Sequence, residues 1–372
     1  MNIGIDGRAA KWYRGTGIGT YTYQLISNIN KIDNINDYLL FLPKNSDLHL
    51  NNNFKIKSID ESPNSNFWDE VNAPNILNNT DIELYHVPQN GVGLADNINC
   101  LKVITLHDII PLRMPETVSD RYLNIFHNEL PKIINNCDGI ITVSQFSKDD
   151  IAKEFNFPKE KIFVTYLGAE DIYKPLDKSS CKEFLKSNYN LDKNFILYVG
   201  GYSPRKNIIG ILEAFSLLSP KLRENLSVVI TGKKGISYSI YMKRAEDLGI
   251  KDSVIFTDFI PLNHLPIFYN ACEFLAYPSF YEGFGLPPLE AMACGAPVIT
   301  SNVTSIPEIC SDSALLVDPN NIVQLSSSMD QLLSDDSLRK SMINNGLANC
   351  LKYSWLNTAK DTVKAYADII NS

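Results

Sequence analysis

Short runs of apolar residues alternate along the chain with segments in which apolar side chains recur at helical spacing. Continuous apolar runs are typical of strands buried on both faces, and the spaced pattern is typical of amphipathic helices. A first series of predicted strands covers residues 2–6, 38–42, 82–87, 101–106, 139–143 and 161–166. A second series covers residues 195–201, 227–232, 253–259, 273–279, 296–301 and 314–318. The alternation predicts an α/β fold with two doubly wound parallel sheets.

The break between the two series predicts a domain boundary. Residues 171–194 have few consecutive apolar positions, so we interpret them as a linker. The first domain is expected to span residues 1–172, the linker and second domain residues 173–353, and a terminal helix residues 354–372. Ligands of doubly wound sheets bind at the carboxyl ends of the strands, so the site is expected in the cleft between the domains.

The composition fits this two-domain organisation. A chain of 372 residues can form two domains that each bury a core, and its 44% apolar and 20% charged residues are typical of a globular protein. The net charge is 34 − 42 = −8 and there is no long basic run, which argues against nucleic acid as a partner.

Several features indicate a cytoplasmic location. Seven scattered cysteines without a CxxC pair are typical of reduced thiols. The chain opens on a strand followed at once by Asp6 and Arg8, so no signal peptide is expected. No apolar stretch approaches the roughly 18 residues that span a membrane. Residues 122–134 form an amphipathic helical pattern with few lysines, which favours core packing over membrane docking, although peripheral membrane contact stays open.

The most informative segment is EGFGLPPLE, which begins at Glu282 and ends at Glu290. Gly283 and Gly285 allow the backbone to approach a ligand, and a helix is predicted from Leu286 onward. The amino end of that helix, with a partial charge of roughly +0.5, favours an anion. Two carboxylates at a fixed separation can accept hydrogen bonds from two sets of sugar hydroxyls. The alternative interpretation is a capped core helix whose carboxylates lie on the surface. The glycines between them favour the ligand site.

A second candidate lies where a strand of the second series ends. Gly200 and Gly201 allow close backbone approach, and the adjacent cations Arg205 and Lys206 follow. A diphosphate leaving group needs both features, because charge-assisted bonds stabilise the charge that grows on its oxygens. The alternative is a solvated pair of cations, which is disfavoured at the amino end of a helix unless an anion is near.

Two candidates belong to the first domain. The segment GTGIGT, which contains Gly17 and Gly19, opens a helix and is either a phosphate cradle or a tight turn. A dinucleotide site is a poor interpretation, because Asp37 precedes the second strand instead of ending it. His107 and Asp108 end a strand, where a side chain meets the expected site, although a lone histidine is often structural. The remaining histidines show no metal-binding spacing, so no metal is expected.

These motifs together resemble a known enzyme family. GGYSPRKN, the run from FYNACEFL to TSIPEI, and ALLVDP resemble the retaining glycosyltransferase family 4. GTGIGTY, VITLHDIIPLRMPE and ITVSQFSKDDI resemble its mannosyltransferase-like branch, which serves bacterial surface polysaccharide synthesis. The resemblance covers nearly the whole chain. It implies the GT-B fold, with two Rossmann-like domains facing a cleft, and metal-independent, retaining transfer of a sugar from a nucleotide diphosphate donor.

The resemblance also implies a role for each site residue. Glu290 would hold the ribose hydroxyls and Glu282 a hydroxyl of the donor sugar. Arg205 and Lys206 would bind the diphosphate, and His107 would lie near the C6 hydroxyl of the sugar.

Other implied roles concern the backbone and the acceptor. Gly17 and Gly19 would approach the diphosphate, and three residues would offer backbone N–H groups: Phe284, Gly285 and Leu286. The terminal helix, residues 355–370, would cross back to the first domain. On the acceptor side, residues 44–77 are rich in Asn and Ser and match no motif of the family.

The expected reaction is front-face transfer of a hexose. The resemblance implies GDP-mannose as the preferred donor and a glycan or lipid-linked glycan as the acceptor. No cofactor is expected. The alternatives are a UDP-sugar-dependent transferase, a sugar-nucleotide epimerase on the same fold and a non-enzymatic sugar-binding paralogue. The oligomeric state stays open.

Overall fold

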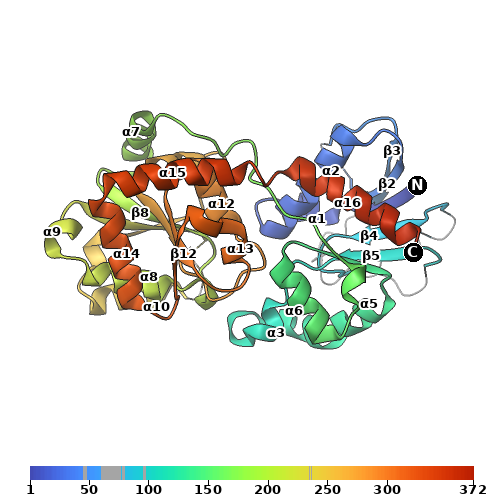
Figure 1. The fold of residues 1–372 in the computed structure, drawn as a ribbon, viewed down its shortest axis with the longest axis horizontal. Coiled ribbons are helices and arrows are strands. Elements are labelled where there is room, and N and C mark those ends of the chain that lie inside the picture. Colours follow the sequence, from blue (N-terminus) through green and yellow to red (C-terminus); the bar gives the residue numbers. More distant parts are fainter. Residues whose placement is uncertain (45–47, 60–76, 78–79, 95–97, 234, 236) are drawn as a thin grey trace. The chain divides into compact units, whose positions relative to one another are not determined.

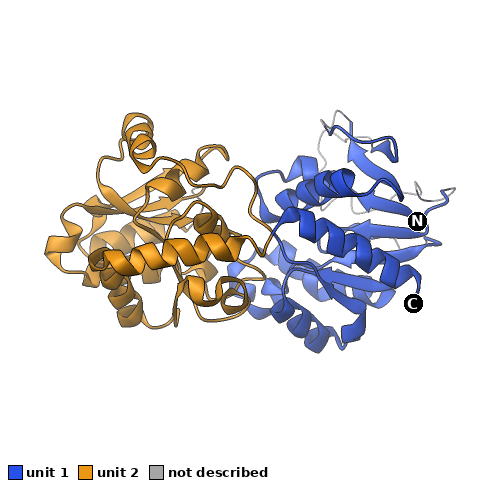
Figure 2. Cartoon of the chain, turned by 45° about the horizontal axis from the view of Figure 1, so that its top comes forward, with its two compact units in different colours: residues 1–167, 354–372 blue, residues 168–353 orange. Residues whose placement is uncertain are grey.

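The computed structural model describes the chain except for residues 45–47, 60–76, 78–79, 95–97, 234 and 236. Most of the segment 44–77, assigned above to the acceptor side, therefore lies outside the described residues. The chain divides into two compact units, drawn in blue and orange in Figure 2. Unit 1 comprises Met1–Leu167 and Ser354–Ser372, and unit 2 comprises Gly168–Tyr353.

In the described part of unit 1, seven parallel strands form one sheet in the order β3-β2-β1-β4-β5-β6-β7. Their bounds are β1 Asn2–Asp6, β2 Asp37–Pro43, β3 Phe54–Ile59, β4 Leu84–Val87, β5 Leu101–Thr105, β6 Gly139–Thr142 and β7 Ile162–Val164. The helices that accompany this sheet are α1 Arg8–Trp12, α2 Gly17–Ile32, α3 Ile110–Arg113, α4 Asp120–Asn124, α5 Leu130–Asn136, α6 Gln145–Phe155 and α16 Trp355–Ile370. Three further single turns are η2 Pro115–Thr117, η3 Ile125–Glu129 and η4 Lys159–Lys161.

In the described part of unit 2, six parallel strands form a sheet in the order β10-β9-β8-β11-β12-β13. Their bounds are β8 Asn194–Val199, β9 Leu226–Thr231, β10 Val254–Asp258, β11 Phe274–Tyr277, β12 Val298–Ser301 and β13 Leu315–Val317. The helices are α7 Lys178–Tyr189, α8 Ile208–Leu217, α9 Pro220–Arg223, α10 Tyr238–Asp247, α11 Leu265–Ala271, α12 Leu286–Ala293, α13 Ile306–Cys310, α14 Ile322–Ser334 and α15 Asp336–Cys350, labelled in part in Figure 1. Short turns are η5 Pro204–Lys206, η6 Lys251–Ser253 and η7 Ser311–Ser313.

The prediction of two Rossmann-like parallel sheets is confirmed. Each of the twelve predicted runs overlaps a strand of the structure, and the central strands are fully buried, as their apolar sequences require. β3 was not predicted. It pairs with β2 at the edge of the sheet in unit 1.

Two local predictions are wrong. Residues 171–194 are not a plain linker, because they contain α7, whose buried Cys181 and Leu185 belong to the core of unit 2. Residues 122–134 are not one regular helix, because a π-helical turn, η3, separates α4 from α5 near Pro131. The side chains of Phe126 and Leu130 are nevertheless buried in the core of unit 1, which confirms core packing for this segment.

The C-terminal helix α16 is part of unit 1 and packs on α2. Its Tyr366 hydroxyl lies 2.7 Å from Nδ1 of His86 on β4, and both side chains are fully buried. Among the described residues, no helix is long and apolar enough to cross a membrane.

Candidate functional site

Two loops of unit 2 follow neighbouring strands of its sheet. β8 pairs with β9 on one side and with β11 on the other, so the chain changes winding direction at β8. Such a switch point opens a crevice at the carboxyl ends of the strands, where ligands bind. The loop after β8 carries Gly200 and Gly201 and leads into η5, and the loop after β11 carries Glu282.

The loop after β8 is fixed at both ends. Gly200 adopts a φ of +150°, and Asn207 ends η5 in the left-handed region with a φ of 59°. The Asn207 side chain caps α8 by accepting the N–H of Gly210 at 3.1 Å, and its Nδ2 donates to the carbonyl oxygens of Pro278 and Pro319. This buried asparagine therefore ties the cationic turn to the loop that follows β11.

Arg205, Lys206 and Glu282 form one cluster, in which Lys206 and Glu282 are buried and Arg205 is partly exposed. Arg205 Nη1 lies 2.9 Å and Lys206 Nζ 2.6 Å from the same oxygen, Oε1 of Glu282. Lys206 Nζ also donates to the hydroxyl of Tyr277, and Arg205 Nη1 donates to the carbonyl oxygen of Tyr281 at 2.8 Å. Glu282 is only 6% exposed. The structure thus brings together three residues that the sequence analysis selected from two segments far apart in the chain.

The electrostatics of this cluster fix the charge of Glu282. Burial by itself raises the pKa of the Glu282 carboxyl, but Arg205 and Lys206 outweigh burial and lower that pKa to about 2. Glu282 is therefore ionised at any physiological pH. It can accept hydrogen bonds from hydroxyl groups, and it cannot serve as a proton donor near pH 7.

The loop that carries Glu282 is fixed by hydrogen bonds to two side chains that follow β12. Thr304 Oγ1 accepts the N–H of Glu282 at 3.1 Å, and Ser305 Oγ donates to the carbonyl oxygens of Glu282 and Phe284. In the described part of the chain, the backbone N–H groups of Phe284, Gly285 and Leu286 donate to no protein acceptor. Three successive free donors beside a cationic pair make an anion-binding backbone segment.

The amino end of α12 offers fewer donors than the sequence analysis assumed. Gly285 is the cap residue with a φ of +104°, and no side chain caps the helix. Pro287 and Pro288 occupy the first turn and have no N–H, so the donors lie mainly in the loop before the helix. A Cβ at Gly285 would lie 2.6 Å from Cδ1 of Ile306, so this position also requires glycine for packing.

Glu290 on α12 is separate from the cationic cluster. Its Oε2 accepts the hydroxyl of Tyr269 at 2.8 Å. Burial, more than the neighbouring carboxylate Glu170, raises the pKa of Glu290 to about 7, and hydrogen bonds from Tyr269 and Tyr173 oppose that rise. The carboxyl group of Glu290 therefore changes charge near neutral pH, in contrast with Glu282.

His107 of unit 1 lies directly after β5. Its Nε2 is 3.0 Å from the carbonyl oxygen of Pro88, its backbone N–H donates to Oδ1 of Asn90 at 3.0 Å, and its ring packs edge-on against Tyr21. A carbonyl oxygen only accepts, so Nε2 carries the proton and Nδ1 is left as an acceptor. Burial lowers the pKa of His107 to about 4, so the imidazole is neutral at pH 7.

The glycines of unit 1 have different surroundings. The helix α1 lies between β1 and the GTGIGT segment that contains both glycines. This helix was not predicted from the sequence. A Cβ at Gly17 would meet no atom within 4 Å, whereas a Cβ at Gly19 would lie 1.9 Å from the carbonyl oxygen of Tyr13. Gly19 is therefore needed for packing of the helix start, and only Gly17 leaves open space for a ligand. Thr16 caps α2 by accepting the N–H of Gly19 at 3.2 Å.

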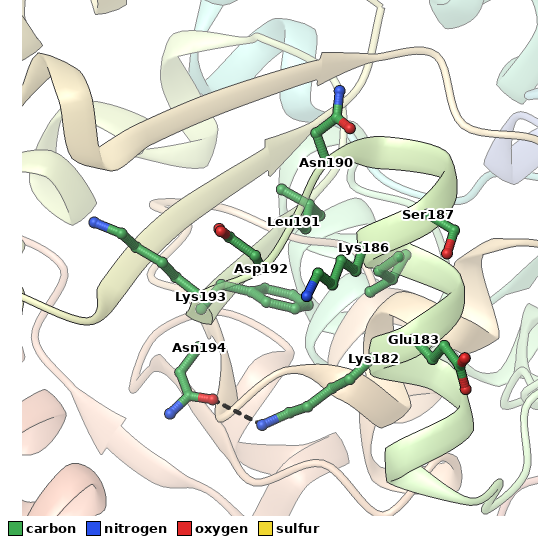
Figure 3. A pocket seen from close by; sticks show the side chains of 11 residues that line it. Lys182, Glu183, Lys186, Ser187, Asn190, Leu191, Asp192, Lys193 and Asn194 are labelled. Atoms are coloured by element: carbon green, nitrogen blue, oxygen red, sulfur yellow. Dashed lines mark hydrogen bonds between the residues drawn. The ribbon is translucent and has the colours of Figure 1, made fainter.

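One pocket of unit 2 lies away from these residues. It has a volume of about 640 Å³ and lies between α7 and the amino end of β8, as Figure 3 shows. Lys182 and Asn194 form a hydrogen bond of 2.7 Å on its wall. The glycine-rich loop follows the opposite, carboxyl end of β8, so this pocket belongs to a different edge of the sheet.

Within the described ranges, no group of three or more His, Cys, Asp or Glu side chains could hold a metal ion. Five polar residues that support the site were not predicted from the sequence, namely Asn90, Asn207, Tyr277, Thr304 and Ser305. Their only sequence signal is an asparagine or threonine at a turn, and the structure shows positive φ angles at Asn90, Asn207 and Thr304.

Comparison with known proteins covers both units. The family model described as Glycosyltransferase Family 4 matches residues 15–171, and the model described as Glycosyl transferases group 1 matches residues 181–348. The chain is 36% identical over 264 residues to O-antigen chain mannosyltransferase B of Escherichia coli, which covers 71% of this chain and 69% of that protein. It is 30% identical over 283 residues to the serotype-specific mannosyltransferase WbdA of Escherichia coli, which covers 75% of this chain but 35% of that protein.

Solved structures share the fold at low sequence identity. Sucrose-phosphate synthase from Thermosynechococcus elongatus has a TM-score of 0.75 and 18% identity, with 100% of this chain and 99% of that chain covered. HepE of Anabaena, in complex with UDP and glucose, has a TM-score of 0.75 and 16% identity, with 99% of each chain covered.

Proposed function

The chain belongs to the group 1 and family 4 glycosyltransferases and has their GT-B fold, and on this premise we propose that it transfers mannose from GDP-mannose to a growing surface glycan. Transfer proceeds with retention and without a metal ion, and the acceptor is a glycan or lipid-linked glycan at the cytoplasmic face of the membrane. Mannose is supported by the names of similar proteins, which are mannosyltransferases.

The observation that carries this proposal is the cluster of Arg205, Lys206 and Glu282. Two cations converge on one ionised carboxylate, beside three free backbone N–H groups. The cations and N–H groups match a diphosphate, and the carboxylate matches the hydroxyl groups of a sugar attached to it. An isolated phosphate or an isolated sugar would use only half of this arrangement.

The cluster also explains how the leaving group is stabilised. Glu282 holds both cations in place before the donor binds, so little reorganisation is needed when charge develops on the diphosphate. Hydrogen bonds from charged donors of this kind typically contribute about 1.5 to 3 kcal/mol each. The loop donors Phe284, Gly285 and Leu286 add neutral hydrogen bonds to the same anion.

The chemical step exchanges one bond of the sugar for another. The bond between C1 of mannose and the β-phosphate oxygen breaks, and its electron pair leaves with GDP. C1 becomes oxocarbenium-like, and the acceptor hydroxyl oxygen forms the new bond on the same face, which retains the configuration. The proton of that hydroxyl passes to the departing phosphate oxygen, so Glu282 need not act as nucleophile or base. The neutral His107 accepts a hydroxyl of the sugar at Nδ1.

The proposal of metal independence is supported by the countercharge that the protein supplies. Arg205 and Lys206 offset the charge that magnesium neutralises in other nucleotide sites. Glu282 is already committed to these two cations at 2.9 and 2.6 Å, so its carboxylate is a poor metal ligand.

The test is a donor screen with and without excess chelator. Purified protein is incubated with GDP-mannose, UDP-glucose or dTDP-glucose and a mannose-terminated acceptor, and nucleoside diphosphate release is measured. We expect GDP release from GDP-mannose that EDTA leaves unchanged, with an α-linked product by NMR. Loss of activity in EDTA with recovery in magnesium would contradict metal independence, and release of UDP but not GDP would contradict the donor. An isomerised donor in the absence of acceptor would indicate an epimerase instead.

A further inference from the structure

Two tyrosines converge on the carboxylate of Glu290. Tyr269 on α11 donates its hydroxyl to Oε2 of Glu290 at 2.8 Å, and the hydroxyl of Tyr173 donates to the same carboxylate. The two rings pack edge-on, with 5.7 Å between their centroids. Each tyrosine therefore fixes the ring of the other and, through its hydroxyl, the position of Glu290.

Tyr173 comes from the connecting segment, residues 168–177, through which the chain enters unit 2 before α7. Asn270 on α11 accepts the N–H of Leu176 at 2.7 Å and donates to the carbonyl oxygen of Lys174 at 3.0 Å. Tyr173 itself lies in no helix or strand. The hydrogen bonds of Asn270 therefore hold the connecting segment against α11, beside the position where Tyr173 meets Glu290.

The tyrosines are buried, whereas Glu290 is partly exposed: Tyr269 is 0% and Tyr173 is 5% exposed. Burial, and then the negative charge of Glu290, raises the pKa of both tyrosine hydroxyls, so they stay protonated and donate. An ionised carboxylate offers about four lone-pair positions, and the two tyrosines occupy some of them. The remaining positions suit a ligand with two adjacent hydroxyl groups.

Hydrogen bonds stabilise the ionised form of Glu290. Within the described residues, the titratable groups that face it are Glu170 and Tyr173 from the connecting segment, Tyr269 from α11 and Cys294 at the end of α12. Burial and the negative charge of Glu170 oppose ionisation of Glu290, and burial keeps the Cys294 thiol neutral by raising its pKa. None of these groups is a cation, in contrast with Glu282 and its two cations. The tyrosine hydroxyls therefore determine where the Glu290 carboxylate lies and help to determine the pH at which it ionises.

We propose that Tyr173 and Tyr269 are positioning residues of the nucleotide site, which hold the carboxylate of Glu290 so that it accepts both ribose hydroxyls of the donor. This inference rests on the proposed function for the nucleotide that Glu290 binds. A ribose presents its 2′ and 3′ hydroxyls side by side, and they need acceptors at a fixed separation. Two buried rings that pack on each other supply such a fixed geometry. Because Tyr173 belongs to the connecting segment, that segment contributes to nucleotide binding through Glu290.

The test is calorimetric binding of GDP and of 2′,3′-dideoxy-GDP, which lacks both ribose hydroxyls, to the full chain between pH 6 and pH 9. The ratio of the two affinities measures the ribose contact alone. We expect the wild type to bind GDP about tenfold more tightly than the dideoxy form at pH 8, because the lost bonds are to a charged acceptor. The ratio should rise with pH through a midpoint of about 7, where Glu290 ionises. If UDP binds more tightly than GDP, UDP and its dideoxy form take their place.

Tyr173→Phe and Tyr269→Phe keep the ring and remove the hydroxyl. Each should raise the midpoint by about one pH unit, because the ionised form of Glu290 loses a hydrogen bond. The affinity ratio at pH 7 should therefore fall by about threefold, while binding of the dideoxy nucleotide changes little. In a Glu290→Gln background, removing either hydroxyl should have no further effect on the ratio, because both tyrosines act through Glu290.

Tyr189→Phe is the matched control. The Tyr189 hydroxyl lies 2.7 Å from Nδ1 of His264, so this change also removes one tyrosine hydrogen bond from unit 2. That bond joins the end of α7 to the start of α11 and does not involve Glu290. The affinity ratio and its midpoint should match those of the wild type. Circular dichroism checks that each variant is folded.

The outcomes distinguish this inference from the proposed function. Equal loss of GDP and dideoxy-GDP binding in both tyrosine variants, a midpoint that stays at its wild-type pH, or equal binding of the two nucleotides by the wild type would overturn the positioning role. Any of these results together with intact mannosyl transfer would keep the proposed function. A lowered ratio and a raised midpoint without mannosyl transfer would support the positioning role and overturn the proposed activity. Absence of binding by every nucleotide would overturn both.

Discussion

Glu282 is the residue on which the charge balance of the candidate site depends, because two cations share one of its oxygens. If Arg205 or Lys206 is removed, Glu282 keeps the other cation as its partner. If Glu282 is removed, both cations lose the carboxylate that they share. The individual effects of the two cations can therefore be measured in folded protein, with Glu282 still ionised by its remaining partner.

Arg205→Ala and Lys206→Ala are each expected to lower turnover by about 100-fold while changing the Michaelis constant less. The reason is that charge on the leaving diphosphate grows in the transition state, so the lost interaction is stronger there than in the bound donor. Steady-state kinetics with GDP-mannose checks this expectation. Lys243→Ala, which removes an exposed cation paired with Asp247 on α10, is the control and should leave kcat unchanged. A raised Michaelis constant with unchanged kcat in both variants would contradict the role in the transition state.

Glu290 should make nucleotide binding depend on pH. Its pKa of about 7 means that the carboxyl is mostly protonated at pH 6 and mostly ionised at pH 8, and only the ionised form accepts two ribose hydroxyls. GDP affinity should therefore rise by up to about tenfold from pH 6 to pH 8. Calorimetry should show that Glu290→Gln flattens this rise. Glu282→Gln should preserve it, since Glu282, with a pKa of about 2, does not titrate in this range.

The raised pKa of Glu290 also has a consequence for stability. The folded state binds this proton more tightly than the unfolded chain, whose carboxyl titrates near 4.5. The stabilisation is therefore fully present below pH 4.5 and is lost as the pH rises through about 7. A donor that binds ionised Glu290 acts in the opposite direction, so GDP should protect unit 2 from unfolding more strongly at pH 8 than at pH 6.

At the scale of elements, the prediction of strands succeeded wherever both faces of a strand are buried. β3 was missed because its sequence, FKIKSI, alternates lysine with apolar residues instead of forming an apolar run. Lysines are typical of edge strands, where they discourage pairing with other chains, and β3 is at the edge of its sheet. The helix α7 was missed because polar residues dominate it, although Asp177 caps its first turn at Ser180.

The residues of the candidate site were predicted from the sequence, but their arrangement in space was not. Arg205 and Glu282 are 77 positions apart, and only the adjacency of β8 and β11 brings their loops together. Sequence motifs assigned the cations to phosphate and the carboxylate to sugar, and the pairing of these groups with one another was not foreseen. The different titration of Glu282 and Glu290 could not be predicted either, because it depends on which neighbours accompany each buried carboxyl.

The start of α2 offers a test of which glycine serves packing and which serves a ligand. Gly19→Ala should destabilise unit 1 by about 3 kcal/mol, because a methyl group cannot lie 1.9 Å from the Tyr13 carbonyl oxygen without moving the backbone that follows α1. Gly17→Ala should leave stability unchanged or raise it by up to about 1 kcal/mol, since its Cβ meets open space. Urea unfolding measures both. If Gly17 approaches the donor, Gly17→Ala should still lower turnover, and full activity would exclude that role.

At the scale of the whole molecule, the chain leaves unit 1 after β7, builds unit 2 and returns to unit 1 in α16. The returning helix is anchored by buried polar contacts. Thr358 Oγ1 on α16 donates to the carbonyl oxygen of Tyr166 at 2.5 Å, and the Tyr366 hydroxyl lies 2.7 Å from His86, whose other ring nitrogen lies 2.8 Å from Thr105 Oγ1. Tyr21 on α2 also contacts Thr105, at 3.0 Å. These bonds link the last helix of the chain to the centre of the first sheet.

Tyr366→Phe should therefore weaken the attachment of α16 to unit 1. The change removes one hydroxyl and leaves Nδ1 of His86 buried without its partner, at a cost of about 1 to 3 kcal/mol. Protonation cannot relieve this cost, since burial, and then the electrostatic effect of the nearby His107 ring, holds the pKa of His86 near 3. Hydrogen exchange of the α16 amides should accelerate by about 10- to 100-fold relative to those of α8 in unit 2.

Tyr23→Phe on α2 is the matched control, because its ring packs against Arg14 and its hydroxyl forms no hydrogen bond within the described residues. Equal exchange of α16 in the wild type and Tyr366→Phe would show that apolar packing alone holds the returning helix.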